Sequence, residues 1–563
     1  GSGPWVGVDM ENGTFLGANG SYLGNTPVPD DFVTAMAKND GQSTYAIETG
    51  NAQSGGLTTQ WSGTLPDLGG YMPMQKEGGI VLGTGGDNSN AGVGTWFEGV
   101  MTSGYPSSAA DAAVQANIVA AGYAGNSAGS AGSTGSTGAS AGTAGQAVLH
   151  DGYTSVYTVN AKTGHLDETY LAAICAPNCA PGQGWATQDL SATAGTPPVQ
   201  PGTQPVALYH DGYTSVYTVD ASDGHLQETY LAAICAPSCA PGQGWATQDL
   251  SATVGTPTTV TTPSAVYHDG YVSVYTADAS SGDLQETFLA AICAPSCAPG
   301  QGWATQDLSA TAHTPAVLDS TAPVAVLHDG YVSVYTVDAS GSQVGHLQET
   351  YLAAICAPSC APGQGWATQD LSATVGTPLT LVTPGADYHS GYTSVYTVDA
   401  SDGDLQETFL AAICAPSCAP GQGWATQDLS ATAHTPRVSL GTSPVALFHD
   451  GFNSVYTVDA SDGHLDETFL AAICAPSCAP GQGWATQDLS VHPGTPPTDQ
   501  TPIALLHLDQ SGGLNWVSVW TINSSSNHLD ETYLPALCAP SCAPGQGWAT
   551  QDLSAHPGTP PAT

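Results

Sequence analysis

Positive charge is almost absent from this sequence of 563 residues. It has four cations, Lys38, Lys76, Lys162 and Arg437, against 47 acidic residues, and its formal net charge is −43. A chain this acidic repels nucleic-acid phosphates and anionic membrane surfaces, so we expect neither as a partner. Charged residues make up only 9% of the chain. Its polar surface must therefore be mostly Ser, Thr, Asn, Gln and Gly, which suits carbohydrate contact or an extracellular setting.

Cysteine is absent from residues 1–123, no apolar run is long enough to cross a bilayer, and no signal peptide is present, so we expect a mature form. All 14 cysteines form seven pairs of the pattern Cys-Ala-Pro-(Ser/Asn)-Cys. No other ligand stands at a zinc-site spacing within a unit, so we predict one local disulfide per unit and no metal or cofactor. Disulfides form in oxidising compartments, which predicts a secreted protein. The pairs are Cys175–Cys179, Cys235–Cys239, Cys293–Cys297, Cys356–Cys360, Cys414–Cys418, Cys474–Cys478 and Cys538–Cys542.

The segment CAP(S/N)CAPGQGWATQDLS occurs seven times, and its tryptophans are 58 to 64 residues apart. A fixed period of this kind indicates a repeat architecture. Within the second unit we predict strands at 206–209, 214–219, 225–231 and 245–250, separated by turn-forming residues. Seven four-stranded units predict a seven-bladed β-propeller, which leaves only short, protected sheet edges. A linear β-solenoid is the alternative, although its coils are usually shorter.

The remainder of the chain has two parts. Residues 1–123 read as mostly β, with a strand at 96–100 and a short helix at 109–121. Residues 124–146 are almost entirely Ala, Gly, Ser and Thr, which predicts a flexible linker without a core. The predicted fold class is therefore all-β, with the propeller at 147–563.

Several repeat segments, SVYT, GHLQETYL, GWATQDLS and the Gly-Thr-Pro tail, resemble those of seven-bladed bacterial lectin propellers of the tectonin-like and fucose-lectin type. In such lectins, sugars commonly sit in shallow pockets against aromatic rings. The resemblance implies sugar contact by the repeated tryptophans, by aromatics of the Tyr217 type and by acids of the Glu228 and Asp249 types. The alternative is that each Trp is blade core and each Asp fixes a turn. The tryptophans are Trp185, Trp245, Trp303, Trp366, Trp424, Trp484 and Trp548.

The segments GPWVGVDMENGTFLGAN, YAIETGNAQSGGLTTQWSG and YMPMQKEGGIVLGTGGDNSNAGVGTWFEGV resemble the second half of the catalytic domain of α-L-arabinofuranosidase B, glycoside hydrolase family fifty-four. The resemblance spans residues 3–123. It implies a retaining glycosidase in which Glu11 is the nucleophile and Asp87 the general acid/base. From the residues alone, each acid is more simply interpreted as a solvated surface acid or a turn residue. The family positions that line the arabinose pocket are Asp9, Asn12 and Gly86.

The sequence departs from this family in two ways. It begins in mid-domain, so the first half of the family's jelly-roll-like β-sandwich is missing. A half sandwich exposes an apolar face and open sheet edges, and we expect a separate chain to supply the missing half. The family's β-trefoil arabinose-binding module is also absent, and the propeller takes its place.

The leading hypothesis is a secreted, modular glycoside hydrolase that releases α-L-arabinofuranosyl branches from an arabinose-containing polysaccharide. A lectin-like propeller with several weak sites would hold the enzyme on this polymer. A competing hypothesis is a non-catalytic lectin or an extracellular structural protein, in which the hydrolase part is only a scaffold. A third is a metal-binding repeat protein built on the Cys pairs, which a free-thiol count near zero under denaturing conditions would exclude.

Overall fold

The computed structural model divides into two compact units, residues 1–125 with 130–132, and residues 126–129 with 133–563. In the first unit the described residues are 6–9, 14–15, 17, 24–28, 30, 32–40, 43–66 and 105–120. In the second they are 147–150, 153–172, 184–210, 213–232, 244–268, 271–289, 302–328, 331–352, 365–389, 392–411, 423–449, 452–470, 483–507, 516–535 and 547–563. Each unit is described by itself.

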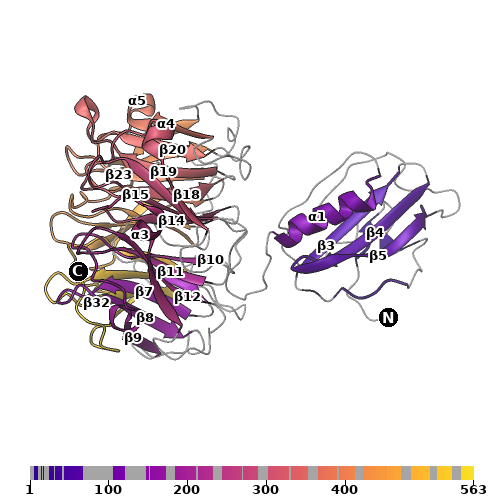
Figure 1. The fold of residues 1–563 in the computed structure, drawn as a ribbon, viewed down its shortest axis with the longest axis horizontal. Coiled ribbons are helices and arrows are strands. Elements are labelled where there is room, and N and C mark those ends of the chain that lie inside the picture. Colours follow the sequence, from indigo (N-terminus) through magenta and orange to yellow (C-terminus); the bar gives the residue numbers. More distant parts are fainter. Residues whose placement is uncertain are drawn as a thin grey trace. The chain divides into compact units, whose positions relative to one another are not determined.

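The second unit consists of seven four-stranded antiparallel sheets, in each of which the strands lie in sequence order (Figure 1). Each sheet is one blade and is built from one repeat. The first strand of every blade contacts the first strands of the blades before and after it, and β30 of the last blade contacts β6 of the first. The sheets therefore form a closed ring, and the predicted seven-bladed propeller is confirmed. The cysteines lie outside the described residues, so the disulfides remain a prediction.

The bounds of the strands agree from blade to blade. The first strands are β6 (Ala147–His150), β10 (Val206–His210), β14 (Ser264–His268), β18 (Val324–His328), β22 (Gly385–His389), β26 (Val445–His449) and β30 (Ile503–His507). The second strands are β7 (Tyr153–Val159), β11 (Tyr213–Val219), β15 (Tyr271–Ala277), β19 (Tyr331–Val337), β23 (Tyr392–Val398), β27 (Phe452–Val458) and β31 (Trp516–Ile522). The third strands are β8 (Leu166–Ala172), β12 (Leu226–Ala232), β16 (Leu284–Leu289), β20 (Leu347–Leu352), β24 (Leu405–Ala411), β28 (Leu465–Leu470) and β32 (Leu529–Pro535). The fourth strands are β9 (Trp185–Asp189), β13 (Trp245–Asp249), β17 (Trp303–Asp307), β21 (Trp366–Asp370), β25 (Trp424–Asp428), β29 (Trp484–Asp488) and β33 (Ala549–Asp552).

A single helical turn follows the fourth strand in blades 1 to 5, where the sequence predicted none. In blade 2 it begins after Asp249, whose carboxylate accepts a hydrogen bond from the Ala252 backbone N–H, and it ends at Gly255 with a φ of 80°. Asp is a favoured N-cap and Gly a favoured residue for left-handed geometry, but five residues are too few to show helical periodicity. In blades 6 and 7 this segment contains His-Pro and forms turns. The helices are α2 (Leu190–Ala194), α3 (Leu250–Val254), α4 (Leu308–Ala312), α5 (Leu371–Val375) and α6 (Leu429–Ala433), and a 3-10 turn, η1 (Gly341–Gln343), lies in blade 4.

The hydrophobic core of the propeller lies between blades. Each of its seven clusters joins residues of two neighbouring blades, as where Tyr157 of blade 1 packs with Val216 and Trp245 of blade 2. Blade 7 and blade 1 share such a cluster too, with Trp520 packed against Trp185. Both faces of each sheet are buried as a result, which explains why the strands show little alternation of apolar and polar residues.

The ring closes with the same contacts that join consecutive blades. Ala562 forms a β-bridge with Asn160 of blade 1, as Val199 does with Asp220 between blades 1 and 2. Hydroxyl groups of threonines are paired at these junctions, at 2.8 Å between Thr169 and Thr559 of the closing pair. Since every described blade takes all its strands from one repeat, the ring closes without exchange of a strand between the first and last blades.

The first unit contains a three-stranded sheet of β3 (Val33–Asn39), β4 (Thr44–Asn51) and β5 (Ser54–Thr64), in the order β3-β4-β5. Helix α1 (Ser108–Ala120) packs against β5 and confirms the helix predicted at 109–121. A two-stranded sheet of β1 (Val8–Asp9) and β2 (Thr14–Phe15) completes the described elements. The strand predicted at 96–100 lies outside the described residues.

One interface between blades differs from the others. Between blades 5 and 6, Asp387 stands where the other blades have Leu or Val, and Asn453 stands where they have Thr or Val. Asp387 is 6% exposed and neither of its carboxylate oxygens has a hydrogen-bond partner among the described residues. Asn453 donates a hydrogen bond of 2.6 Å to the Tyr396 hydroxyl. Burial, with the nearby Glu407 carboxylate, raises the pKa of Asp387 well above its usual range.

We therefore expect the Asp387→Leu variant to be more stable than the wild-type protein by about 1–3 kcal/mol at pH 7, because the substitution removes an unpaired buried polar group. The free energy of unfolding from denaturant titration measures this. The matched control is Leu447→Asp, which places a carboxyl at the same position of blade 6 and should destabilise it. Equal or lower stability of Asp387→Leu would show that the carboxyl is satisfied in solution.

Candidate functional site

Of the predicted catalytic-domain residues, Glu11, Asn12, Gly86 and Asp87 lie outside the described residues. Asp9 is described for its backbone only, as the last residue of β1. The geometry of the acid pair therefore remains a prediction, and the structure describes what flanks it.

The strands on either side of Glu11 in the sequence are paired with each other. Val8 of β1 is the register partner of Phe15 of β2, and Asp9 is that of Thr14. Phe15 and Val8 pack in one apolar cluster with Tyr45 and Ile47 of β4. This packing attaches the pair of strands that brackets Glu11 to the central strand of the larger sheet.

A buried polar contact strengthens the attachment. The Tyr45 hydroxyl donates a hydrogen bond to the backbone carbonyl of Gly17, just after β2. Burial raises the pKa of Tyr45 to about 12, so this hydroxyl keeps its proton at physiological pH. The Tyr45 ring also packs against Trp61 of β5, with 6.3 Å between ring centroids.

A buried ion-pair cluster joins the sheet to helix α1. The Lys38 ammonium on β3 lies 3.3 Å from a carboxylate oxygen of Glu48 on β4 and contacts Asp111 in the first turn of α1. Burial by itself lowers the pKa of Lys38, but the hydrogen bond to Asp111 and the charge of Glu48 outweigh it and raise that pKa. Removing one partner would leave an unpaired buried charge, so the cluster fixes α1 on the sheet.

In the propeller, the seven repeated tryptophans are buried, with 7–9% of each residue exposed. Each ring packs edge-on against an aromatic ring of the preceding blade, as where Trp245 lies 6.3 Å from Tyr157 with planes at 75°. At the closing interface Trp185 packs against Trp520 at 6.4 Å and 84°. A sugar stacks on an exposed ring face, which these rings lack, so the geometry supports the alternative that each Trp is blade core.

Residues of the Glu228 and Tyr217 types are buried as well. Ser215 donates a hydrogen bond of 2.7 Å to Glu228, and Ser215 lies 3.1 Å from the ring nitrogen Nε2 of His210. Gln248 donates to the other carboxylate oxygen of Glu228. Burial raises the pKa of Glu228 and raises that of Tyr217 well above its usual range. The side chains of His210, Ser215, Glu228 and Gln248 form an internal network within the blade.

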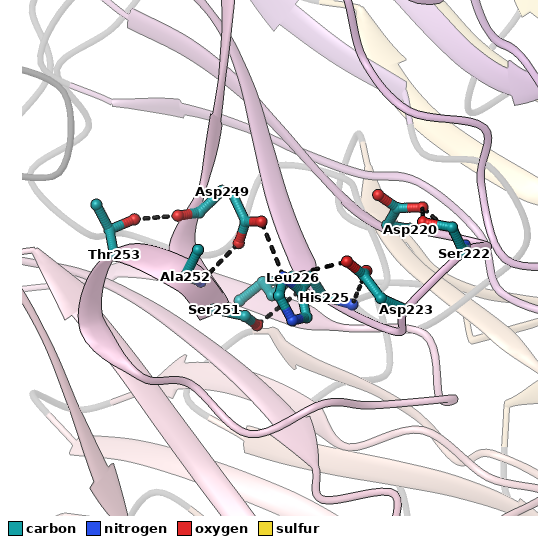
Figure 2. Close-up of polar contacts among 9 residues, drawn as sticks. All are labelled: Asp220, Ser222, Asp223, His225, Leu226, Asp249, Ser251, Ala252 and Thr253. Atoms are coloured by element: carbon teal, nitrogen blue, oxygen red, sulfur yellow. Dashed lines mark hydrogen bonds and ion pairs between the residues drawn. The ribbon is translucent and has the colours of Figure 1, made fainter.

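Residues of the Asp249 type remain partly accessible, and Figure 2 shows their surroundings in blade 2. One carboxylate oxygen of Asp249 accepts from the Ala252 backbone N–H at 2.7 Å, and the other lies 2.8 Å from Nδ1 of His225. This hydrogen bond raises the pKa of His225 and favours the imidazolium form. Asp223 lies 3.5 Å from the same nitrogen. The sequence analysis had identified Asp249 but missed His225.

The His–Asp pair recurs in five blades, with 2.8 to 2.9 Å between Nδ1 and the carboxylate oxygen. Asp283 and Asp404 replace the His in blades 3 and 5. Within the described ranges, no group of three or more His, Cys, Asp or Glu residues has a geometry that could hold a metal ion. Among the same residues, no helix is long and apolar enough to cross a membrane.

Comparison with known proteins finds relatives that are similar to the first unit. Residues 1–124 match the family model described as "Alpha-L-arabinofuranosidase B, catalytic". An arabinofuranosidase/B-xylosidase of Trichoderma koningii is 55% identical over 125 residues, which are 22% of this chain and 25% of that protein. An α-L-arabinofuranosidase B of Aspergillus niger is 56% identical over 124 residues, with the same coverage of both chains. The chain thus spans about a quarter of the length of the curated relatives it matches.

Solved structures give two kinds of similarity. A family fifty-four α-L-arabinofuranosidase soaked with a cyclic sulfate inhibitor has 42% identity, with 30% of this chain and 34% of that chain covered and a TM-score of 0.21. The propeller domain of the Trilobed protease from Pyrococcus furiosus has 5% identity, with 69% of this chain and 93% of that chain covered and a TM-score of 0.34.

The burial of the repeated tryptophans predicts a structural effect of their removal. The Trp245→Ala variant should lose about 3–5 kcal/mol of propeller stability, because it leaves a large cavity against Tyr157. Trp245→Phe should lose less, since it keeps an aromatic ring at the interface. Thermal unfolding and glycan binding measured on both variants check this. A Trp245→Ala protein that is as stable as wild type but has lost glycan binding would show that the indole is a ligand contact.

Proposed function

We propose that this chain is part of a secreted, retaining α-L-arabinofuranosidase whose propeller binds carbohydrate. The observation that carries the proposal is the 55% identity to an arabinofuranosidase over the segment that contains Glu11 and Asp87. Both acids are present in this chain, in the motifs DMEN and GGDNSN. The substrate class is a polysaccharide with α-L-arabinofuranosyl branches.

The reaction needs two carboxyl groups in different protonation states. Glu11, as the carboxylate, attacks the anomeric carbon and forms a glycosyl–enzyme ester while the leaving oxygen takes a proton from Asp87. Asp87, now ionised, removes a proton from water, which attacks the ester and releases arabinose with retained configuration. Asp9, Asn12 and Gly86 would line the sugar pocket.

We also propose that a further polypeptide segment completes the catalytic sandwich, supplied as a separate chain. Among the described residues, β3 lies at one edge of its sheet and pairs only with β4, and a sheet edge is a place where a further strand can pair. One face of this strand is apolar and exposed, at Val33 (40% exposed), Ala35 and Ala37. A strand added along this edge would extend the sheet, and a second sheet packed on its apolar face would cover these side chains.

Because the repeated tryptophans of the propeller are buried, a sugar would contact its accessible polar groups instead. The side chains of His225 and Asp249 are 28% and 34% exposed, and both can exchange hydrogen bonds with sugar hydroxyls. The pair recurs around the ring, so several weak contacts would act together on one branched polymer. The alternative to an enzyme is that the whole protein is a non-catalytic lectin or an extracellular structural protein.

The decisive experiment is release of arabinose by the purified protein, beside Glu11→Gln. We expect Glu11→Gln to lose activity by roughly a thousandfold or more on an aryl α-L-arabinofuranoside, because it removes the nucleophile. Asp87→Asn should lose less activity on this activated substrate than on an alkyl arabinofuranoside, whose poor leaving group needs acid assistance. Initial rates on both substrates measure the difference.

The charge-matched control is Asp223→Asn on the propeller surface, which should leave the activity unchanged. Wild-type activity that survives in Glu11→Gln would reject this nucleophile. A wild-type preparation that is folded and inactive on every arabinofuranoside, even after addition of a chain that supplies the first half of the family's catalytic domain, would instead identify a binding or structural protein.

A further inference from the structure

The third strand of each blade carries a position at which the repeats fall into two groups. Gln occupies it in blades 2 to 5, at Gln227, Gln285, Gln348 and Gln406. Asp occupies it in the other three, at Asp167, Asp466 and Asp530. Because the ring joins blade 7 to blade 1, the three Asp blades are consecutive and lie on both sides of the closing interface. We call blades 6, 7 and 1 the seam arc.

In each blade this residue faces the Asp at the end of the fourth strand. Gln227 is the register partner of Asp249. Burial by itself raises the pKa of Asp249, but hydrogen bonds from the Ala252 backbone N–H, His225 and Gln227 outweigh it and lower that pKa. In the seam arc the partner of Asp488 is Asp466. The amide donor is thereby replaced by a second carboxyl, and two carboxyl groups face each other.

These carboxyl groups are deeply buried. Asp466 is 2% exposed and Asp530 is 4% exposed, and Oδ2 of each has no hydrogen-bond partner among the described residues. Asp167 differs, because its Oδ2 accepts a hydrogen bond of 3.1 Å from Asn160. A buried carboxylate without a partner is costly, whereas a protonated carboxyl can donate to the facing Asp.

The neighbours of Asp466 supply little compensating positive charge. The groups acting on it are Asp488, Asp459, Asp462 and His464. Both carboxylate oxygens of Asp488 already have hydrogen-bond partners. One lies 2.9 Å from Nδ1 of His464, and the other accepts from the backbone N–H groups of residues 490 and 491.

The other two pairs have the same composition. Asp530 faces Asp552, with His528 and Asn523 nearby. Asp167 faces Asp189, with His165 and Asn160 nearby. A His thus accompanies each Asp pair, whereas the blades with Asp in place of this His, blades 3 and 5, both keep Gln on the third strand. No described blade combines three carboxyl groups at these positions.

We propose that the seam arc is a proton-dependent clasp of the ring, in which the buried third-strand Asp of each facing pair holds a proton while the propeller is closed. Loss of these protons would weaken the blades next to the closing interface and leave blades 2 to 4, which have Gln at this position, unaffected. In blade 1 the connection to the closure is direct. Asn160, which donates to Asp167, is the residue whose backbone forms the β-bridge with Ala562.

The electrostatics give the direction of the pH dependence. Burial, then the facing carboxylate, raises the pKa of Asp466 to about 8 and that of Asp530 to about 6, and burial raises that of Asp167 to about 6. An unfolded Asp has a pKa of about 4. The stability contributed by each proton is therefore fully present below about pH 4 and is lost as the pH rises through the folded pKa. The clasp is tightest in acid.

The test uses the full chain with Asp167→Gln, Asp466→Gln and Asp530→Gln combined, which gives the seam arc the residue of blades 2 to 5. Calorimetric Tm values are compared from pH 5 to pH 8.5. We expect the wild-type Tm to fall relative to the variant as the pH rises. At pH 7, unfolding of the wild type should release about one proton more than unfolding of the variant. The number of protons released is obtained from calorimetric unfolding enthalpies measured in buffers of different ionisation enthalpy.

A reverse variant and a local readout complete the design. Gln227→Asp, in a blade that already has His225, should acquire the pH dependence that the triple variant loses. Hydrogen exchange, corrected for its intrinsic pH dependence, should accelerate in β28, β32 and β8 above pH 6 but not in β16 or β20. If the triple variant does not fold, Asp466→Gln alone carries the comparison. Tm curves that stay parallel, with equal proton release, would overturn the proposal, as would acceleration spread evenly around the ring.

Discussion

Packing between neighbouring blades is the constraint on which the propeller depends. Residues on opposite faces of one strand, such as Val216 and Tyr217, are both fully buried, because each blade is covered by a blade on either side. In an open row of such blades, the outer faces of the first and last blades would be exposed to solvent, and only a closed ring buries them. Closure of the ring is therefore needed to bury the core completely. At the closing interface Trp185 packs against Trp520, as a Trp packs against a Tyr at each of the other interfaces between blades.

This constraint also decides how polar residues are used. Between two apolar sheets a hydroxyl or carboxyl needs a partner, and the repeats supply one through paired threonines and through the network around Glu228. Some buried carboxyl groups depart from this pattern at particular blades. Asp387 stands alone between blades 5 and 6, while Asp466 faces another carboxyl in blade 6. Although the repeats are nearly identical elsewhere, the seam arc differs from the other blades by the buried Asp on its third strands, which we propose holds a proton.

Most of the propeller was predictable from its sequence, and the exceptions have physical reasons. The strand predicted at 206–209 ends one residue later, and that predicted at 214–219 begins one residue earlier. Helix α3 was missed because one turn has no periodicity to detect. The role of Trp245 could not be decided from spacing, since a conserved interval is the same for a buried and an exposed ring. His225 was missed because its partner Asp249 is 24 residues away, and only the sheet register brings them together.

What could be predicted for the first unit came from its resemblance to a family and not from a repeated pattern. The resemblance of its motifs around Glu11 and Asp87 predicts a chemistry, whereas its described core shows how β1 and β2 are attached to the sheet through Phe15 and Tyr45. Retaining hydrolysis requires a separation of the two carboxyl groups of roughly 5–5.5 Å. Such a separation needs support from both sides of the site. Among the described residues the sheet ends at β3, so the proposed activity would require that a further segment complete the support there.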